Sequence, residues 1–236
     1  MRSKTFIIIF ISTFLLLLNS CVTYYYPQAV DVPLIKEKGD FRLDVGGFII
    51  PKINPTNESD SSVLADMGIH STFSAGITDL LATQTFVSLD VLLRVHLHGA
   101  LGLYKAFDNN TVMELYCGFG YGNGFLSGMH SEGKDDYLLS FAQFNIGHSG
   151  SGKSNTDFGL GLKGGYLHTN SVNGDFYKKN GWVFDPSIFI RFGGNKAKYN
   201  IKLIYMWTDT VAEQYYFPLS MSMGVNLDLG KKSKNK

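Results

Sequence analysis

Proline and cysteine are scarce in this chain, and long apolar runs are missing beyond its first twenty residues. There are 6 prolines and 2 cysteines among 236 residues, against 26 glycines and 14% aromatic residues. The apolar run at residues 6–18 is shorter than the about 20 residues that a transmembrane helix needs. The sequence therefore predicts no membrane-spanning helix, and its glycine- and aromatic-rich composition favours β structure.

Charge of either sign is not in excess. The formal net charge is +1, and removing residues 1–20 takes away Arg2 and Lys4 but no acidic residue, which leaves 19 basic and 20 acidic residues. Such a chain lacks the basic excess with which proteins neutralise nucleic-acid phosphates. It also has no glycine-rich phosphate loop, no Cys-x-x-Cys pair and no helical zinc motif. We therefore predict no nucleic-acid partner and no cofactor.

Apolar and polar residues alternate along most of the chain. From Tyr215 to Leu229 apolar residues occupy every odd position. This period of two is the repeat of a strand with one apolar and one polar face. A strand of this length can cross a bilayer, which takes about 9–11 residues.

Repetition of the pattern predicts ten spanning strands. They are expected at residues 41–49, 63–77, two within 84–106, 113–121, 136–147, 158–166, 182–192, 199–207 and 215–229. The stretch 84–106 is about twice the length of a spanning strand, so we place a turn within 92–96. The apolar face keeps its parity there, which requires an odd-numbered loop. A single overlong strand would give nine strands, whereas bacterial single-chain barrels have an even number.

Aromatic residues and linker lengths distinguish the two strand ends. Four aromatic residues fall at one end, namely Tyr121, Trp182, Trp207 and Tyr215. Rows of this kind lie at lipid interfaces, and the linkers at that end are mostly longer, as expected outside the cell. Lipid offers no partner to a free strand edge. We therefore predict an all-β fold, a closed antiparallel up-and-down transmembrane β-barrel of ten strands, with eight or nine as the alternative.

The N-terminus has the parts of a lipoprotein leader. Arg2 and Lys4 precede the apolar region, and Leu18-Asn19-Ser20-Cys21 follows in place of an A-x-A cleavage site. This resembles the bacterial lipobox, which implies that Cys21 becomes the lipidated first residue. An ordinary export signal that leaves Cys21 as a free thiol is the alternative. The chain divides into a signal peptide at 1–20, a lipidated tether at 21–40, a barrel at 41–230 and a basic tail at 231–236.

Residues 22–39 are polar, broken by proline and aperiodic, which predicts a tether. Within them, VPLIKEKGD at residues 32–40, soon after Cys21, resembles a family of outer-membrane β-barrel lipoproteins of the Bacteroides group. The resemblance extends loosely to residues 118–122, 141–147 and 185–186. It implies a lipid-anchored barrel and no particular activity.

The polar faces of the predicted strands carry equal numbers of acidic and basic residues. They are Arg42, Arg94, Lys163, Arg191 and Lys202, and Asp44, Asp66, Asp90, Glu114 and Asp185. Selective pores usually carry rings of one sign. The balance therefore predicts an ion-pair network in a narrow or side-chain-filled lumen, with a small-solute path as the alternative. His96 and His98 share one face, but no third ligand lies nearby, so no metal site is predicted.

Two features at the long-loop end raise the possibility of hydrolysis. His168 lies in a run that faintly resembles the His-x-Ser-Asn run of outer-membrane lipid A deacylases, although Asn170 stands in the place of the serine. His130, Glu132 and Asp135 lie together in one loop, and ten-stranded outer-membrane proteases use such groups to activate water. Solvated polar loops explain the same residues.

These observations favour an outer-membrane lipoprotein with a structural or surface-interaction role and no catalysis. Its expected partners are outer-membrane lipid and the machineries of barrel assembly and lipoprotein export. A hydrolase at the extracellular rim and a small-solute channel are the alternatives.

Overall fold

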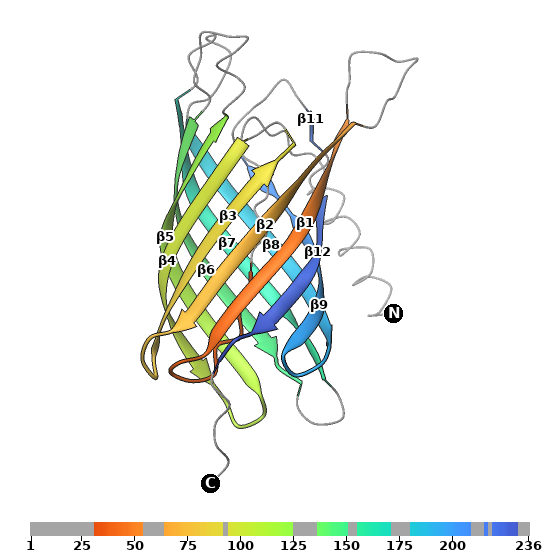
Figure 1. The fold of residues 1–236 in the computed structure, drawn as a ribbon. Helices are drawn as coiled ribbons and strands as arrows, with labels where there is room; N and C mark the ends of the chain where they lie inside the picture. The colour runs from red at the N-terminus through yellow and green to blue at the C-terminus, as the bar shows by residue number, and fades with distance from the viewer. Residues whose placement is uncertain are drawn as a thin grey trace, which may run out of the picture.

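The chain forms a closed barrel of antiparallel strands (Figure 1). The computed structural model describes residues 31–53, 64–91, 94–124, 136–150, 155–170, 180–208, 215–216 and 219–230. The strands are β1 (Phe41–Ile53), β2 (Leu64–Gly76), β3 (Leu81–Asp90), β4 (Arg94–Ala106), β5 (Thr111–Gly124), β6 (Asp136–His148), β7 (Thr156–Asn170), β8 (Asn180–Gly193), β9 (Ala197–Tyr205), β10 (Trp207–Thr208), β11 (Tyr215–Tyr216) and β12 (Leu219–Asp228). No helix among the described residues is long and apolar enough to cross a membrane.

Each of the membrane spans pairs with the next span in sequence, and the last span pairs with the first. β12 is hydrogen-bonded to β9 on one side and to β1 on the other, and β9 also pairs with β8. The short β10 extends the β9 span beyond Met206, and the short β11 pairs with the end of β1. The twelve strand segments therefore make ten spans, which confirms the predicted ten-stranded up-and-down barrel.

The ambiguous stretch at residues 84–106 is two strands. β3 ends at Asp90 and β4 begins at Arg94, and Leu89 pairs with Val95 across the connection. Three residues lie between the strands. This odd number preserves the alternation, so the apolar side chains of β4 face outward like those of β3. The alternative of one overlong strand is excluded.

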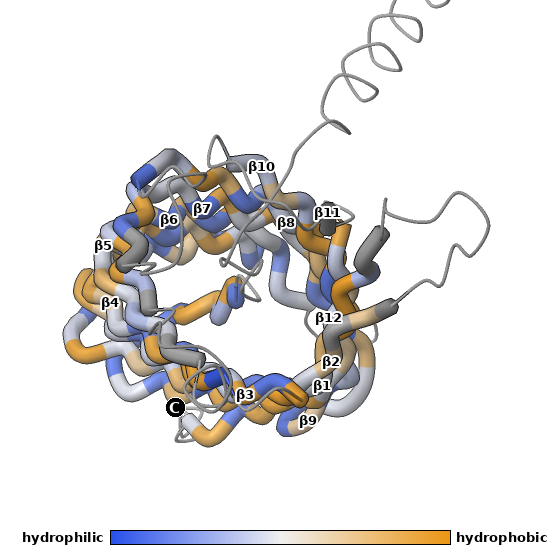
Figure 2. Tube along the Cα trace, turned by 90° about the horizontal axis from the view of Figure 1, so that it is seen from above, coloured by the Kyte–Doolittle hydropathy of each residue, from blue (hydrophilic) through white to orange (hydrophobic). Residues whose placement is uncertain are grey.

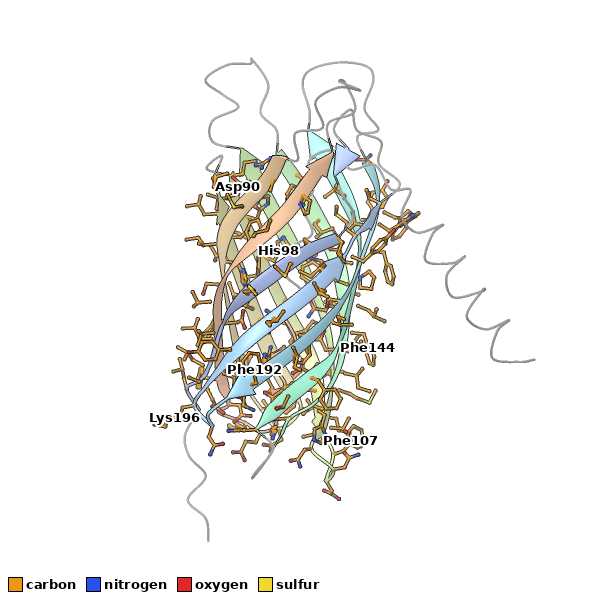
Figure 3. The ribbon with its side chains drawn as sticks, turned by 90° about the vertical axis from the view of Figure 1, so that its right-hand side faces the viewer. Asp90, His98, Phe107, Phe144, Phe192 and Lys196 are labelled. Carbon is orange, nitrogen blue, oxygen red and sulfur yellow. The ribbon has the colours of Figure 1, made fainter. Side chains whose placement is uncertain are left out.

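The outer surface is apolar, as expected of a barrel embedded in lipid. Leu101 and Phe119 are 66% and 74% exposed, and Phe144 and Phe192 point away from the barrel in Figure 3. Exposed aromatic side chains form rows near both ends: Tyr121, Tyr166, Trp182 and Trp207 near one, and Phe41, Phe107, Phe158, Phe192 and Tyr199 near the other. This is the surface of an outer-membrane-type β-barrel.

The two ends differ in their connections. At one end short turns join the strands, for example residues 107–110 and 194–196, and β1 begins and β12 ends there. We call this the short-turn end. At the other end residues 54–63, 125–135 and 171–179 join the strands, and we call this the long-loop end.

The barrel interior is only partly polar. Large apolar side chains also point inward and are buried, among them Phe86, Tyr104, Tyr116, Tyr137 and Phe141. The alternation of apolar and polar residues predicted a mainly polar inward face. The difference arises because the lumen is closed to bulk water, so inward apolar side chains pack together rather than against solvent.

Candidate functional site in the barrel lumen

Residues 31–35 lie inside the barrel, and we call them the plug segment. Figure 2, which looks down the barrel, shows this part of the chain within the ring of strands. Val32, Leu34 and Ile35 are at most 1% exposed. Their polar, aperiodic sequence context predicted a tether between Cys21 and the barrel. The tether assignment does not describe residues 31–35, because their three apolar side chains are buried by the barrel wall.

The apolar part of the plug segment fills the lumen near the short-turn end. Val32 and Leu34 pack in one cluster with Val112 of β5 and Phe189 of β8. Full burial of one such aliphatic side chain stabilises a fold by about 1.5–3 kcal/mol. These contacts supply part of the free energy that holds the segment in place.

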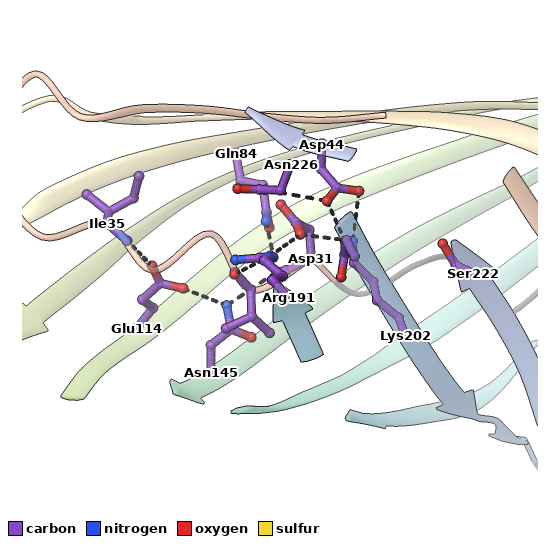
Figure 4. Close-up of polar contacts among 12 residues, drawn as sticks. Asp31, Ile35, Asp44, Gln84, Glu114, Asn145, Arg191, Lys202, Ser222 and Asn226 are labelled. Carbon is purple, nitrogen blue, oxygen red and sulfur yellow. Dashed lines mark hydrogen bonds and ion pairs between the residues drawn. The ribbon is translucent and has the colours of Figure 1, made fainter. Parts of the chain in front are cut away.

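The carboxylate of Asp31 accepts hydrogen bonds from two cations on the neighbouring strands β8 and β9 (Figure 4). Asp31 Oδ1 lies 3.0 Å from Arg191 Nη2 of β8 and 2.9 Å from Lys202 Nζ of β9. All three side chains are at most 1% exposed. Arg191 and Lys202, both predicted to face the lumen, thus bind Asp31, which was not among the predicted lumen residues.

Lys202 also binds Asp44, an acid that was predicted to face the lumen. Its Nζ lies 3.0 Å from Asp44 Oδ1, and His70 Nε2 lies 3.2 Å from the same oxygen. Asn200 and Asn226 donate to the other oxygen, Asp44 Oδ2, at 2.5 and 3.4 Å. The network therefore joins the plug segment to β9, β1 and β2.

Main-chain groups of the plug segment are satisfied by wall side chains. The carbonyl of Asp31 accepts from the amides of Gln84 at 3.0 Å and Gln143 at 2.8 Å. The Ile35 N–H donates to Glu114 Oε1 at 2.8 Å, and Arg191 Nη2 donates to the Val32 carbonyl at 2.7 Å. An aperiodic backbone is tolerated at membrane depth only when it is satisfied in this way.

The backbone of Leu34 adopts a left-handed conformation, with φ 57°. This costs about 1–2 kcal/mol for a non-glycine residue. The buried Leu34 side chain and the bond from the next N–H, that of Ile35, to Glu114 offset this cost. The local turn is therefore maintained by contacts with the wall.

A tight turn connects the plug segment to β1. The Lys36 N–H donates to Asp40 Oδ2 at 2.8 Å, and the Gly39 N–H donates to the Gly76 carbonyl at 2.9 Å. Burial and the nearby Arg42 guanidinium lower the pKa of the Lys36 amine. The segment thus descends through the lumen to the short-turn end and returns upward as β1.

Above the plug segment, aromatic and imidazole rings line the wall. Phe86 lies between His70 and His98, with ring centroids 6.0 and 5.3 Å away, and Phe141 is 5.7 Å from His98. Ring contacts of this kind add about 0.5–1.5 kcal/mol each beyond burial. They rigidify one side of the lumen.

His96 and His98 face the lumen together and meet one phenol. The Tyr137 hydroxyl lies 2.8 Å from His96 Nδ1 and 3.4 Å from His98 Nε2. Within the described ranges, no group of three or more His, Cys, Asp or Glu side chains is arranged to hold a metal ion.

A small cavity of about 20 Å³ lies between the plug segment and this wall. Its polar lining includes Asp31, Thr72, Gln84, Gln143 and Lys163. The volume suits about one water molecule. The cavity itself therefore holds nothing larger than water.

The other predicted lumen residues form separate pairs. Lys163 Nζ lies 3.1 Å from Asp185 Oδ2, and Arg94 Nε lies 2.5 Å from Asp90 Oδ2. Arg42 pairs with Asp228 at 2.9 Å near the short-turn end. The side chain of Asp66 lies outside the described residues.

A further buried pair was missed by the sequence analysis. Lys198 Nζ lies 2.6 Å from Asp157 Oδ1 at the short-turn end. Asp157 lies directly after a glycine- and serine-rich turn, so the sequence pattern did not identify it as an inward-facing residue of β7. The alternation of β7 places it on the same face as Lys163, and this was the available signal.

The residues suggested for hydrolysis are only partly described. His168 is on the exposed face of β7, and its Nδ1 is hydrogen-bonded to Asn180 Oδ1 of β8. His130, Glu132 and Asp135 lie outside the described residues. A hydrolase site at this rim therefore stays a prediction, as does acylation of Cys21, which also lies outside them.

Comparisons with known proteins find a remote likeness among solved structures. No family model and no curated protein matches the sequence. Among solved structures the chain is similar to the outer membrane protein OprG from Pseudomonas aeruginosa. The TM-score is 0.41 and the identity 13%, over 85% of this chain and 100% of that chain. A likeness at this level says nothing about what this barrel does.

Proposed function

We propose that this protein is a bacterial outer-membrane β-barrel lipoprotein with a structural or surface-interaction role, whose lumen is closed by its own N-terminal segment. The observation that carries the proposal is the burial of Asp31 between Arg191 and Lys202, with Val32, Leu34 and Ile35 filling the space below. A lumen closed in this way passes no solute in the resting state. A surface-interaction role would then belong to the connections at the long-loop end.

The proposed location rests on the outer surface. Apolar side chains cover the wall between two rows of exposed aromatic residues, which is the pattern of barrels in the outer membrane. Single-chain up-and-down barrels of an even strand number belong to the same class. Fractionation of a Gram-negative host expressing the full chain should place the protein with the outer membrane.

The proposed lipid anchor rests on the leader and the lipobox-like run that ends at Cys21. We expect the mature protein to begin at Cys21 and to carry a mass increase equal to lipoprotein acylation. Mass spectrometry of the N-terminal peptide measures this. An unmodified Cys21 thiol, or cleavage at another residue, would refute the anchor, and with it the likeness to the Bacteroides-group family.

Planar-bilayer recording tests the closed lumen. The purified barrel, reconstituted in bilayers, should show no conductance steps, whereas a known open porin in the same bilayers provides the positive control. Regular steps from the unmodified protein would favour the small-solute channel and overturn the proposal.

A further inference from the structure

The direction of the plug segment determines which membrane surface the N-terminal anchor reaches. From Asp31 the chain passes toward the short-turn end, where Asp40 accepts the Lys36 N–H, and then becomes β1. The residues before Asp31 must leave the lumen by one of three routes: back past the plug segment to the short-turn end, through the wall, or out at the long-loop end.

The route back past the plug segment is filled. Val32 and Leu34, each 1% exposed, pack against Val112 and Phe189, which are 0% and 5% exposed. At the same level, the Glu114 carboxylate accepts hydrogen bonds from the Ile35 N–H at Oε1 and from the Asn145 amide at Oε2, the latter at 2.9 Å. A second pass of the chain has no space between these groups, because a packed interior leaves few voids larger than a water molecule.

The route through the wall is closed as well. Ten spans are joined edge to edge by continuous strand pairing, including the pairing of β12 with β1. Opening any seam would leave unpaired backbone groups facing lipid, at several kcal/mol each. A lateral exit is therefore much less favourable than an axial one.

We infer that the chain enters the plug from the long-loop end, so that residues 22–30 pass out of the barrel mouth and the acylated Cys21 lies at the outer, cell-surface leaflet. This rests on the proposed membrane location and on acylation of Cys21. The lipid anchor of this protein would thus be on the opposite side of the membrane from its short turns.

The length of the chain allows this path. Cys21 precedes Asp31 by ten residues, which span at most about 33–36 Å when extended. The apolar band of an outer-membrane barrel is about 25 Å tall, and Asp31 already lies within the lumen at the level of Lys202. The segment can therefore reach the rim and turn onto the adjacent lipid surface.

Cysteine labelling on intact cells tests the threading. The full-length chain carries Cys117→Ser, which removes the exposed native thiol of β5, and one new cysteine at a time. Tyr24→Cys reports on the N-terminal segment, Ser131→Cys on the β5–β6 connection at the long-loop end, and Asp108→Cys on the exposed β4–β5 turn at the short-turn end. The probe is a membrane-impermeant maleimide, applied before and after permeabilisation of the outer membrane.

We expect Tyr24→Cys and Ser131→Cys to be labelled on intact cells at least about tenfold more than Asp108→Cys, with Asp108→Cys reaching their level after permeabilisation. Labelling of Tyr24→Cys only after permeabilisation, or only after denaturation, would overturn the threading while Ser131→Cys still reports a correctly placed barrel. If Ser131→Cys itself is not labelled on intact cells, or if the protein is absent from the outer-membrane fraction, the proposed location fails and the threading fails with it.

Discussion

Lys202 Nζ lies 2.9 Å from Asp31 Oδ1, although 171 positions separate the two residues. The same ammonium lies 3.0 Å from Asp44 on β1. β12 lies between β9 and β1 and pairs with both strands. Only this pairing brings Lys202 of β9 within hydrogen-bond distance of Asp44 of β1. The seat of the plug segment is therefore complete only in the closed barrel, which couples plugging to closure.

Substitution of Asp31 should release the plug segment. In Asp31→Ala, Arg191 and Lys202 lose a buried acidic partner, and removal of one member of a buried ion pair typically costs about 3–5 kcal/mol. We expect conductance steps in planar bilayers that the unmodified protein does not show, together with a lower urea midpoint. Asp108→Ala at the exposed β4–β5 turn is the matched control and should leave both unchanged. An Asp31→Ala barrel as silent and as stable as the parent would contradict the plug.

The pair between Lys163 of β7 and Asp185 of β8 should show strong coupling. Their side chains are 2% and 0% exposed and 3.1 Å apart. Lys163→Met leaves Asp185 buried without this cation, so we expect a loss of about 3–5 kcal/mol in the free energy of unfolding, whereas Lys163→Met combined with Asp185→Leu should recover most of it. Urea titration of the four proteins in detergent micelles measures the coupling. Additive effects in the double variant would show that the pair contributes nothing.

The strands could be predicted from the sequence because their outward positions repeat every second residue. The parity of Leu89 and Val95 predicted the β3–β4 connection, and the structure pairs these two residues directly. The inward positions of Lys163, Asp185, Arg191 and Lys202 follow from the same alternation. Local pattern is sufficient here because lipid imposes one rule on the outer face of every strand.

The plug segment could not be predicted in this way. Its contacts with the wall join residues 53 to 171 positions apart, as between Asp31 and Gln84 or Asp31 and Lys202, and no periodicity marks them. One signal was present but unused: Val32, Leu34 and Ile35 form an apolar run within a stretch otherwise typical of a solvated tether. A solvated tether has no reason to carry three such side chains so close together.

The outward face of β4 should tolerate charge only near its end. Leu101 lies within β4 and is 66% exposed, whereas Phe107 follows the strand at the short-turn end. An arginine near the bilayer midplane costs about 2–4 kcal/mol, and one near the interface about 0–1. We therefore expect Leu101→Arg to lower folding into phosphatidylcholine vesicles far more than Phe107→Arg, as measured by urea titration. Equal effects of the two substitutions would argue against this face lying in acyl chains.

The seam between β1 and β12 should be sensitive to one added methyl group. Gly46 pairs with Gly224 across this seam, and a Cβ added at Gly46 would lie 2.3 Å from the main-chain oxygen of Met223. Overpacking of this kind typically costs about 1–3 kcal/mol. At Gly99 on β4 an added Cβ meets no heavy atom within 4 Å.

The two glycines form a matched pair, because replacement by alanine reduces the entropy of the unfolded chain equally at both, by about 0.4–1 kcal/mol. The difference between Gly46→Ala and Gly99→Ala therefore isolates the close approach at the seam. We expect Gly46→Ala to lower the urea midpoint and to slow closure of the barrel, and Gly99→Ala to leave the midpoint unchanged or to raise it slightly. Equal midpoints for the two variants would mean that β1 and β12 do not approach as closely as this register requires, and the closed ring would need a different seam.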